Sequence, residues 1–207
     1  MQLQTTLNAE PIITDTVLAH QAVAGDQYAF ESLVRRYSTS LYSFITRFLG
    51  DHDQASDILQ QVFIQLYTSL PTLRTDRPLK AWLFQVARNR CVDELRRKRV
   101  LHFSELEGKN DEDEVSVVDA LLDSTPLPEE LAECHDLQER LQKAIDTLPV
   151  KFRSVVLLRY AGQLSFPEIG QTLNMPVATA KTYFHRAKPL LRTALTKEAK
   201  ASEYNLQ

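Results

Sequence analysis

Apolar residues recur every three or four positions along most of this chain, which is the spacing of an amphipathic α-helix rather than the alternation of a β-strand. The pattern is clearest at residues 53–70, where one face is apolar and the opposite face is rich in glutamine. Ile64 lies among the polar residues of that second face. This segment is therefore predicted to be a helix that buries one face and exposes Ile64 as an apolar contact.

Capping residues and glycines divide the rest of the chain into helices. Gly25 ends a first helix and Asp26 caps the next. Gly50 ends that second helix, and an aspartate at position 51 or 53 starts the third. The predicted helices span residues 15–24, 27–49, 53–70, 79–99, 130–147, 150–161 and 165–174, followed by one that starts at Pro176. The expected fold class is all-α.

Charge is distributed unevenly along the chain, although its total is only −3. Residues 71–100 carry nine Lys or Arg against three Asp or Glu, and residues 150–192 carry seven against one, so each block is +6. Residues 103–139 between them carry thirteen acids and one base, a net of −12. This acidic stretch contains Pro126 and Pro128 and little helical periodicity, which indicates a flexible linker between two domains. Basic blocks of this kind are typical of polyanion-binding surfaces.

Residues 165–188, SFPEIGQTLNMPVATAKTYFHRAK, contain two short helices joined by a tight turn. Ser165 and Glu168 fit a capping box at the start of the first helix. The first helix is expected to stop near Asn174, and Pro176 starts the second. Two short helices across a three- or four-residue turn are the pattern of a helix-turn-helix.

The second helix of this pair has one apolar face and one small, polar and basic face. At 100° per residue the apolar side, expected to pack on the domain, comprises Val177, Ala180, Phe184, Ala187 and Leu191. The opposite side comprises Ala178, Thr179, Thr182, His185 and Arg186, with Lys181 beside it. Small residues at the start would let the helix enter a DNA major groove, where Arg186 and the hydroxyls reach base edges. A merely solvated face is the alternative; a membrane-surface helix is disfavoured because the outward side lacks bulky apolar residues.

Composition narrows the class of protein further. The 207-residue chain has no run of about 18 apolar residues that would span a membrane, and its N-terminus lacks the basic and apolar regions of a signal peptide. Its two cysteines, Cys91 and Cys134, lack metal-ligand spacing, which suits free thiols in a reducing cytoplasm. No phosphate-binding glycine loop, metal-ligand pair or nucleophile constellation indicates an enzyme. We therefore expect a cytoplasmic, non-enzymatic protein without cofactor, metal or membrane insertion.

Six short motifs keep a fixed order along the two halves of the chain. The first half contains D-x-x-Q-x-x-F from Asp57, A-W-L-F-x-V-A-R-N from Ala81 and D-x-L-R-R from Asp93. The second half contains L-P-x-x-x-R from Leu148, L-S-F-x-E-I-G from Leu164 and T-A-K-T-Y-x-H-R-A from Thr179. Over residues 16–100 and 131–192, the chain thus resembles the bacterial sigma-70 factors, specifically the compact extracytoplasmic-function (ECF) group.

The resemblance implies a specificity subunit of RNA polymerase, with a sigma-2 domain at residues 15–100 and a sigma-4 domain at 131–196. Residues 101–130 would be the acidic linker that threads toward the polymerase active site, with tails at 1–14 and 197–207. The family's sigma-2 domain binds the polymerase clamp, melts the −10 element and captures a flipped base, while sigma-4 reads the −35 element. The implied partners are the clamp and flap regions of core RNA polymerase, duplex and single-stranded promoter DNA, and an anti-sigma factor.

The same resemblance assigns roles to individual residues. The polymerase contacts would be Asp57, Gln60, Gln61 and Ile64. The −10 contacts would be Arg88, Asn89, Arg96 and Arg97, with Asn89 at the pocket for the unpaired base, the loop 71–79 shaping it and the arginines on phosphates. The −35 contacts would be Arg159, Ala178, Thr179, Lys181, Thr182, His185 and Arg186. The alternative is a helix-turn-helix regulator that acts without polymerase, which would need a dimer interface or a ligand-sensing pocket.

Overall fold

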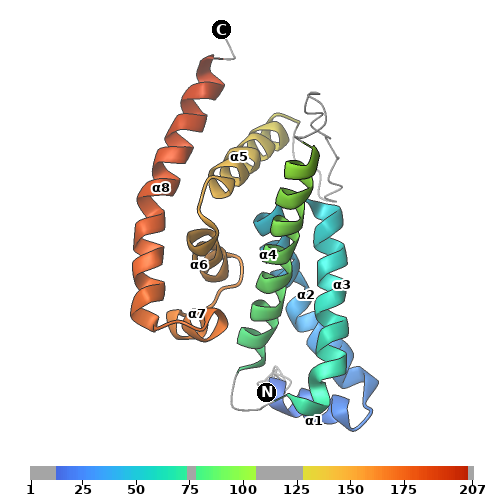
Figure 1. Ribbon diagram of the computed structural model, residues 1–207. Coiled ribbons are helices and arrows are strands. Elements are labelled where there is room, and N and C mark those ends of the chain that lie inside the picture. The colour runs from blue at the N-terminus through green and yellow to red at the C-terminus, as the bar shows by residue number, and fades with distance from the viewer. Residues whose placement is uncertain (1–12, 74–77, 106–127, 205–207) are drawn as a thin grey trace, which may run out of the picture.

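The computed structural model describes residues 13–73, 78–105 and 128–204. Every regular element within these ranges is a helix, which confirms the predicted all-α class. In chain order (Figure 1) they are α1 (Asp15–Val23), α2 (Gln27–Leu49), α3 (His52–Ser69), the 3₁₀ helix η1 (Leu70–Thr72), α4 (Leu79–Glu105), α5 (Pro128–Asp146), α6 (Val150–Tyr160), α7 (Phe166–Leu173) and α8 (Val177–Tyr204).

The helix boundaries follow from capping chemistry that is visible in the sequence. The Asp26 carboxylate accepts hydrogen bonds from the first free backbone N–H groups of α2, at 2.9 and 3.2 Å. Gly50 ends α2 in the left-handed region, with φ +72°. Asp51, rather than Asp53, caps α3 through the backbone N–H of Gln54 at 3.0 Å. Local chemistry therefore sets where α2 and α3 begin and where α2 ends.

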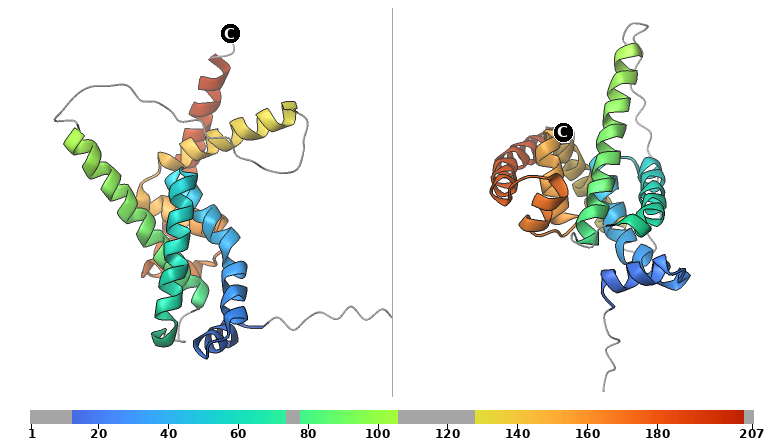
Figure 2. Two further views of the ribbon diagram at one scale, coloured as in Figure 1. Left: turned by 90° about the vertical axis from the view of Figure 1, so that its right-hand side faces the viewer. Right: turned by 60° about the horizontal axis from the view of Figure 1, so that its bottom comes forward.

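Helices α1–α4 form a first unit around an aromatic core. The ring of Phe44 lies 5.6 Å from that of Phe48 and 5.5 Å from that of Phe84, and all three side chains are fully buried. Helix α1 lies across one end of the unit (Figure 2), where the carboxylate of Asp15 accepts a hydrogen bond from the Tyr37 hydroxyl. Burial and this hydrogen bond raise the pKa of Tyr37, so the hydroxyl stays protonated and donates.

Helices α5–α8 form a second unit that ends in the predicted helix-turn-helix. The capping box is present: Ser165 Oγ accepts from the Glu168 N–H at 3.4 Å, and the Glu168 carboxylate accepts from the Ser165 N–H at 2.7 Å. Asn174 closes α7 in the left-handed region, with φ +51°. A Cβ at Gly170 would lie 2.9 Å from the carbonyl oxygen of Met175, so glycine lets the turn fold tightly on α7.

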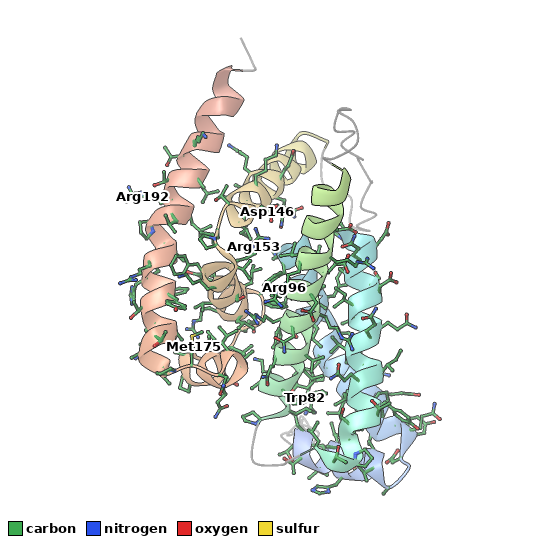
Figure 3. All side chains as sticks on the ribbon, in the orientation of Figure 1. Trp82, Arg96, Asp146, Arg153, Met175 and Arg192 are labelled. Carbon is green, nitrogen blue, oxygen red and sulfur yellow. The ribbon has the colours of Figure 1, made fainter. Side chains whose placement is uncertain are left out.

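The two units pack directly against each other. Helices α6 and α7 lie between α8 and α4, as Figures 1 and 2 show, and the buried apolar residues of both units form one continuous core. Arg153 of α6 is 7% exposed and reaches the other unit, donating to the Phe48 carbonyl at 3.0 Å. It also pairs with Asp146 at 3.2 Å, beside which it lies in Figure 3. The sequence indicated two domains but did not indicate this contact between them.

Two helices are longer than the sequence predicted. Helix α4 runs to Glu105, beyond residue 100 where the first domain was expected to end, and α8 runs to Tyr204, into the expected tail. Helix α5 begins at Pro128, just inside the segment expected to be a linker. The most acidic part of that linker, residues 106–127, lies outside the described residues. None of the described helices is long and apolar enough to cross a bilayer.

Cys91 lies in the core of the first unit, fully buried. Burial raises the pKa of its thiol to about 12, so almost no reactive thiolate exists near neutral pH. In a Cys134→Ala variant, we expect iodoacetamide at pH 8 to leave Cys91 unmodified in the folded protein and to modify it after denaturation, as measured by mass spectrometry. Rapid modification of the folded protein would show that Cys91 becomes accessible and would contradict an inert structural role.

Candidate polymerase and DNA interfaces

Helix α3 presents the predicted polymerase-binding side chains on one exposed face. Asp57, Gln60 and Gln61 are all exposed, and Ile64 is 56% exposed. The opposite face is held in the core by Ala55, Ile58, Val62 and Leu66. The structure thus brings these four predicted residues together on a rigid helix, with an apolar side chain within a polar surface.

Tyr67 extends this face by one turn and was not predicted. Its side chain is 65% exposed, and its ring packs edge-on against Phe30 with the ring centres 5.3 Å apart. Tyrosine three residues after Ile64 falls on the same side of a helix, so the spacing of Ile64 and Tyr67 was the available signal. An exposed isoleucine beside a braced tyrosine is typical of the apolar centre of a protein interface.

The four predicted −10 residues on α4 do not all face the same way. Asn89, Arg96 and Arg97 are exposed. Arg97 pairs with Glu94 at 2.8 Å, and Arg96 lies 3.7 Å from Asp93, both within α4. These exposed pairs contribute little to stability. The loop 71–79 expected to shape the base pocket includes residues 74–77, which lie outside the described residues.

Arg88 instead faces the second unit. Its Nε lies 3.5 Å from the Ser154 hydroxyl on α6, and its Nη1 donates to the Asn89 side-chain oxygen at 3.2 Å. Burial, with a smaller contribution from the nearby Arg96, lowers the pKa of Arg88, although a guanidinium stays charged at neutral pH. Arg88, which was predicted from the sequence to contact DNA, is therefore half-buried between the two units.

Arg90 was not predicted as a site residue but lies on the exposed side of α4. Its Nη2 donates to the Gln65 side-chain oxygen of α3 at 3.2 Å. This contact holds a cation at the junction of the α3 face and the α4 surface. This partner of Arg90 could not be predicted, because Gln65 is 25 residues away along the chain.

The second helix of the helix-turn-helix forms the start of α8, residues 177–187, and is called the recognition helix below. It has the two faces predicted for it. Ala180, Phe184 and Ala187 are buried, and the opposite side is exposed at Ala178, Lys181, Thr182, His185 and Arg186, with Thr179 half-buried. Val177 differs from the prediction, since it is 37% exposed rather than packed on the domain. It occupies the first turn of α8, beyond the edge of the core.

Arg159, the predicted −35 contact on α6, braces the helix-turn-helix. Its Nη1 donates to the Leu164 carbonyl at 2.9 Å, just before α7, and its guanidinium lies 5.3 Å from the centre of the Phe166 ring. Arg159 as a whole remains exposed. A single arginine therefore orients the start of α7 while presenting charge at the same surface.

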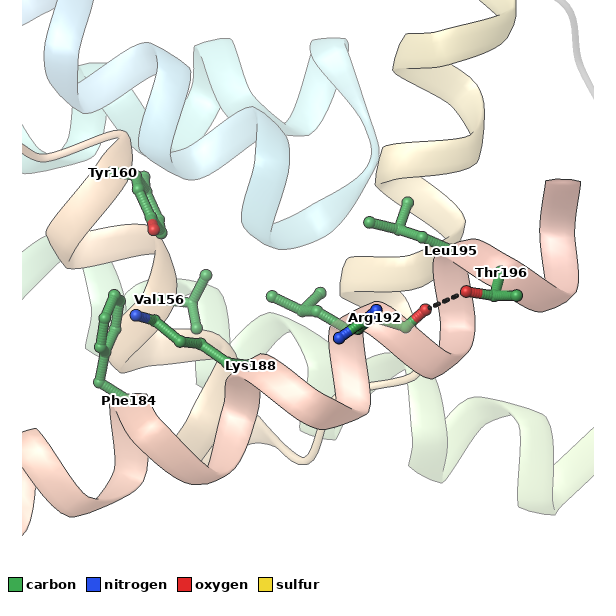
Figure 4. Close-up of a pocket in the computed structure, with 8 residues that line it drawn as sticks. Val156, Tyr160, Phe184, Lys188, Arg192, Leu195 and Thr196 are labelled. Carbon is green, nitrogen blue, oxygen red and sulfur yellow. Dashed lines mark hydrogen bonds between the residues drawn. The ribbon is translucent and has the colours of Figure 1, made fainter.

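An apolar groove lies between α6 and the part of α8 from Phe184 to Thr196. Val156, Tyr160 and Phe184 lie toward one end and Leu195 toward the other, with Lys188 and Arg192 beside them (Figure 4). Leu191 also lines the groove. Lys188 Nζ lies 4.9 Å from the centre of the Phe184 ring. The groove has an apolar floor and a basic rim, which suits an apolar segment that carries acidic residues.

These surfaces define a class of protein: an all-helical protein with an exposed helix-turn-helix, a basic helix and an exposed partly apolar helix face. Two family models match the chain, Sigma-70 region 2 at residues 33–100 and Sigma-70 region 4 at residues 138–191. Together the two matched ranges include the interface residues of α3, α4 and α6 and the start of α8, but not the second half of α8. The chain belongs to the sigma-70 family.

Full-length relatives support the same assignment. The chain is 34% identical over 175 residues to the ECF RNA polymerase sigma factor SigW of Bacillus subtilis, covering 84% of this chain and 93% of that protein. It is 30% identical over 180 residues to the ECF RNA polymerase sigma-E factor of Escherichia coli K12, covering 85% and 91%. The chain is therefore an RNA polymerase sigma factor of the ECF group.

Two solved structures share the fold. CnrH in complex with the cytosolic domain of CnrY has a TM-score of 0.64 at 23% identity, covering 88% of this chain and 97% of that one. The sigma factor RpoE in complex with the anti-sigma factor NepR from Bartonella quintana has a TM-score of 0.61 at 23% identity, covering 81% and 96%. At this level of identity the likeness concerns the fold.

Proposed function

We propose that this sigma factor reads the −35 element with the exposed face of α8, residues 178–186, and contacts the −10 element with α4. The observation that carries the −35 assignment is the division of the recognition helix into a buried apolar face and an exposed face with Lys181, Thr182 and Arg186. Small residues at positions 178 and 179 leave room for the helix to approach base edges. Arg159 adds a phosphate contact from α6.

The −10 contacts are divided between a pocket residue and phosphate-binding residues. Asn89 is exposed and has donors and acceptors for the edge of an unpaired base. Arg96 and Arg97 lie two turns further along α4 and bind backbone phosphates without sequence preference. Arg90, held by Gln65, is added here to the residues assigned from sequence, because it is an exposed cation near Asn89.

Core RNA polymerase binds at two places on this chain. The exposed face of α3, with Asp57, Gln60, Gln61 and Ile64, binds the clamp, and Tyr67 extends the apolar contact. The α6–α8 groove binds the flap region, since an apolar floor with Lys188 and Arg192 at its rim fits an apolar segment with acidic neighbours. The two sites lie on different units of the fold.

The remaining assignments follow from the family. The protein works in the cytoplasm, has no catalytic activity of its own and uses no cofactor. The solved structures similar to it include a sigma factor bound to an anti-sigma factor, and we propose that this chain is likewise held by an anti-sigma factor. The domains correspond to residues 15–100 and 131–196, with the acidic linker 101–130 between them.

The experiment that tests this function is transcription of genomic DNA by purified core RNA polymerase with and without the protein, with mapping of the RNA 5′ ends. We expect new discrete starts that share upstream −35 and −10 sequences. Absence of new starts together with absence of polymerase binding would overturn the proposed function. Binding without new starts would limit the protein to polymerase association.

The groove makes a separate prediction. Replacing Leu195 with aspartate places a charge on its apolar floor, so we expect affinity for the isolated flap region of polymerase to fall roughly tenfold, about 1.4 kcal/mol. Thr193→Asp is the matched control, because Thr193 is exposed on the same helix and does not line the groove. Equal flap affinities of the two variants, measured by calorimetry, would place the flap contact elsewhere.

A further inference from the structure

Helix α6 is buried in its middle and exposed at both ends. Residues 153–158 are all buried, whereas Lys151 just before them and Arg159 just after them are exposed. The helix packs against α8. Aromatic residues next to the two cations, one at each end of α6, contact the recognition helix. Helix α6 therefore crosses the recognition helix and carries one exposed cation at each end.

The N-terminal end of α6 packs at one edge of the recognition helix. The ring of Phe152 lies edge-on to that of Tyr183, with the ring centres 5.4 Å apart. Tyr183 lies about 60° around the helix from Arg186, so it borders the exposed face on the Arg186 side. Lys151 Nζ lies 5.3 Å from the centre of the Phe152 ring and 5.6 Å from that of Tyr183. The ammonium group is thus held at this edge by both rings.

The C-terminal end of α6 packs at the opposite edge. The ring of Tyr160 lies 5.8 Å from that of Phe184, as Figure 4 shows. Phe184 lies about 60° around the helix from Lys181, which borders the other side of the exposed face. Arg159 precedes Tyr160, and its guanidinium lies 5.3 Å from the centre of the Phe166 ring. Both cations of α6 are therefore positioned by aromatic rings, one beside each edge of the recognition helix.

The spacing of the two cations matches the width of a DNA major groove. Lys151 and Arg159 are eight residues apart, which corresponds to a rise of about 12 Å along an α-helix. The major groove of B-DNA is about 12 Å wide, with a phosphate backbone on each side. A helix about 10–12 Å across fills such a groove, so groups at its two edges face the two backbones. One cation would then lie beside each DNA strand.

Lys151 does little to hold the fold together. Within the part of the chain that the structure describes, it forms no ion pair, whereas Arg153 of the same helix pairs with Asp146 at 3.2 Å. Lys151 also lies in the first turn of α6, where the partial positive charge of a helix N-terminus disfavours a cation. This unpaired positive charge would be offset by an anion brought in from outside the chain.

We propose that Lys151 and Arg159 bind phosphates on opposite strands of the −35 element, with the recognition helix in the groove between them. Arg159 was already assigned a phosphate, so the new contact is that of Lys151, and Phe152 and Tyr183 are its positioning residues. The inference rests on the proposed −35 role of α8. It adds that contacts with both backbones fix how the recognition helix lies along the groove, without themselves reading bases.

Lys151→Met tests the contact, because it removes the charge and keeps a side chain of similar length. The affinity of holoenzyme for a promoter found by 5′-end mapping is measured by fluorescence anisotropy over a series of salt concentrations, with core polymerase in excess. We expect the slope of log affinity against log salt to become shallower by about 0.9, with equal weakening on promoters altered at single −35 positions. An unchanged slope would overturn the proposal.

Two further variants control for the loss of charge. Lys151→Arg keeps a cation at the same place and should keep the slope. Lys197→Met removes an exposed cation of α8 beyond the recognition helix and should also keep it. A shallower slope for Lys197→Met, equal to that of Lys151→Met, would show a general effect of net charge and would overturn a specific contact.

The positioning role of Tyr183 is tested through its ring. Tyr183→Phe keeps the ring beneath Lys151 and should keep the salt dependence, whereas Tyr183→Leu removes the ring and should make the slope shallower. In the Lys151→Met background, Tyr183→Leu should add nothing, because the ammonium that it positions is already absent. Full additivity of the two changes would show that Tyr183 acts by itself and would overturn its positioning role.

Neutral methylphosphonates locate each contact on the DNA. One phosphate at a time is neutralised along both strands of the −35 element, and holoenzyme affinity is measured for each fragment. We expect Lys151→Met to lose sensitivity to one neutralised phosphate and Arg159→Met to lose sensitivity to one on the opposite strand. Loss on the same strand for both variants, or no loss for Lys151→Met, would overturn the proposal. Binding by the unsubstituted holoenzyme that does not depend on the −35 sequence would instead overturn the proposed function.

Discussion

Replacing Ile64 with aspartate is expected to lower the affinity of this sigma factor for core RNA polymerase by roughly 100-fold, about 3 kcal/mol. Ile64 is 56% exposed on the α3 face, and complex formation would surround it with protein. A carboxylate at this position would lose its water without gaining a partner, and burial of an unpaired charge is among the largest single-residue penalties at an interface. Fluorescence anisotropy of labelled sigma factor titrated with core polymerase measures the affinity.

The matched control for this prediction is Val23→Asp. Val23 is an apolar residue of α1 with similar exposure, 49%, and it lies outside the α3 face. Because both side chains are exposed in the free protein, neither change should move the thermal midpoint by more than a few degrees. If Ile64→Asp binds polymerase as tightly as Val23→Asp, the clamp contact does not involve the α3 face.

Local features of the fold could be predicted from the sequence because their causes are local. Asp26, Gly50 and Ser165 cap or end helices through contacts within four residues, and each does so in the structure. The two faces of α3 and of the recognition helix follow from the helical period alone, so Ile64 and Arg186 were placed correctly as exposed.

The contact between the two units could not be predicted, because its partners are distant in sequence. Periodicity shows that a position is buried or exposed but not what covers it. Thr172 and Arg153 are buried polar residues that donate to carbonyl groups 91 and 105 residues away along the chain. Arg88 was placed on the DNA side by its motif, yet in this structure it faces α6.

Helix lengths were underestimated for a related reason. Helix α4 continues to Glu105 through the sequence VLHFSE, and α8 continues to Tyr204 through the highly charged sequence KEAKASEY. Apolar periodicity marks only the part of a helix that packs on the core. Residues with high helix propensity can extend the helix beyond that part, into solvent.

Replacing Arg186 with alanine is expected to lower promoter-specific initiation by about tenfold or more while leaving polymerase affinity unchanged. Arg186 is exposed on the recognition helix opposite the buried Ala180 and Phe184, so its loss removes a base or phosphate contact without disturbing the core. A base contact in the major groove contributes about 1–3 kcal/mol of discrimination. Initiation is measured on a promoter found by 5′-end mapping, alongside anisotropy with core polymerase.

The matched control for Arg186→Ala is Lys197→Ala. Lys197 is an exposed cation on the same helix beyond the recognition segment, so both variants lose one positive charge from α8. A base-specific role predicts that Arg186→Ala discriminates poorly among promoters altered at single −35 positions, while Lys197→Ala retains the full ranking. If Arg186 contacts only a phosphate, Arg186→Ala should weaken initiation equally at all of these promoters. It should also make promoter affinity less dependent on salt concentration. Release of polymerase by Arg186→Ala would contradict this assignment, because the exposed face of α8 around Arg186 would then contact polymerase and would not be the −35 reader.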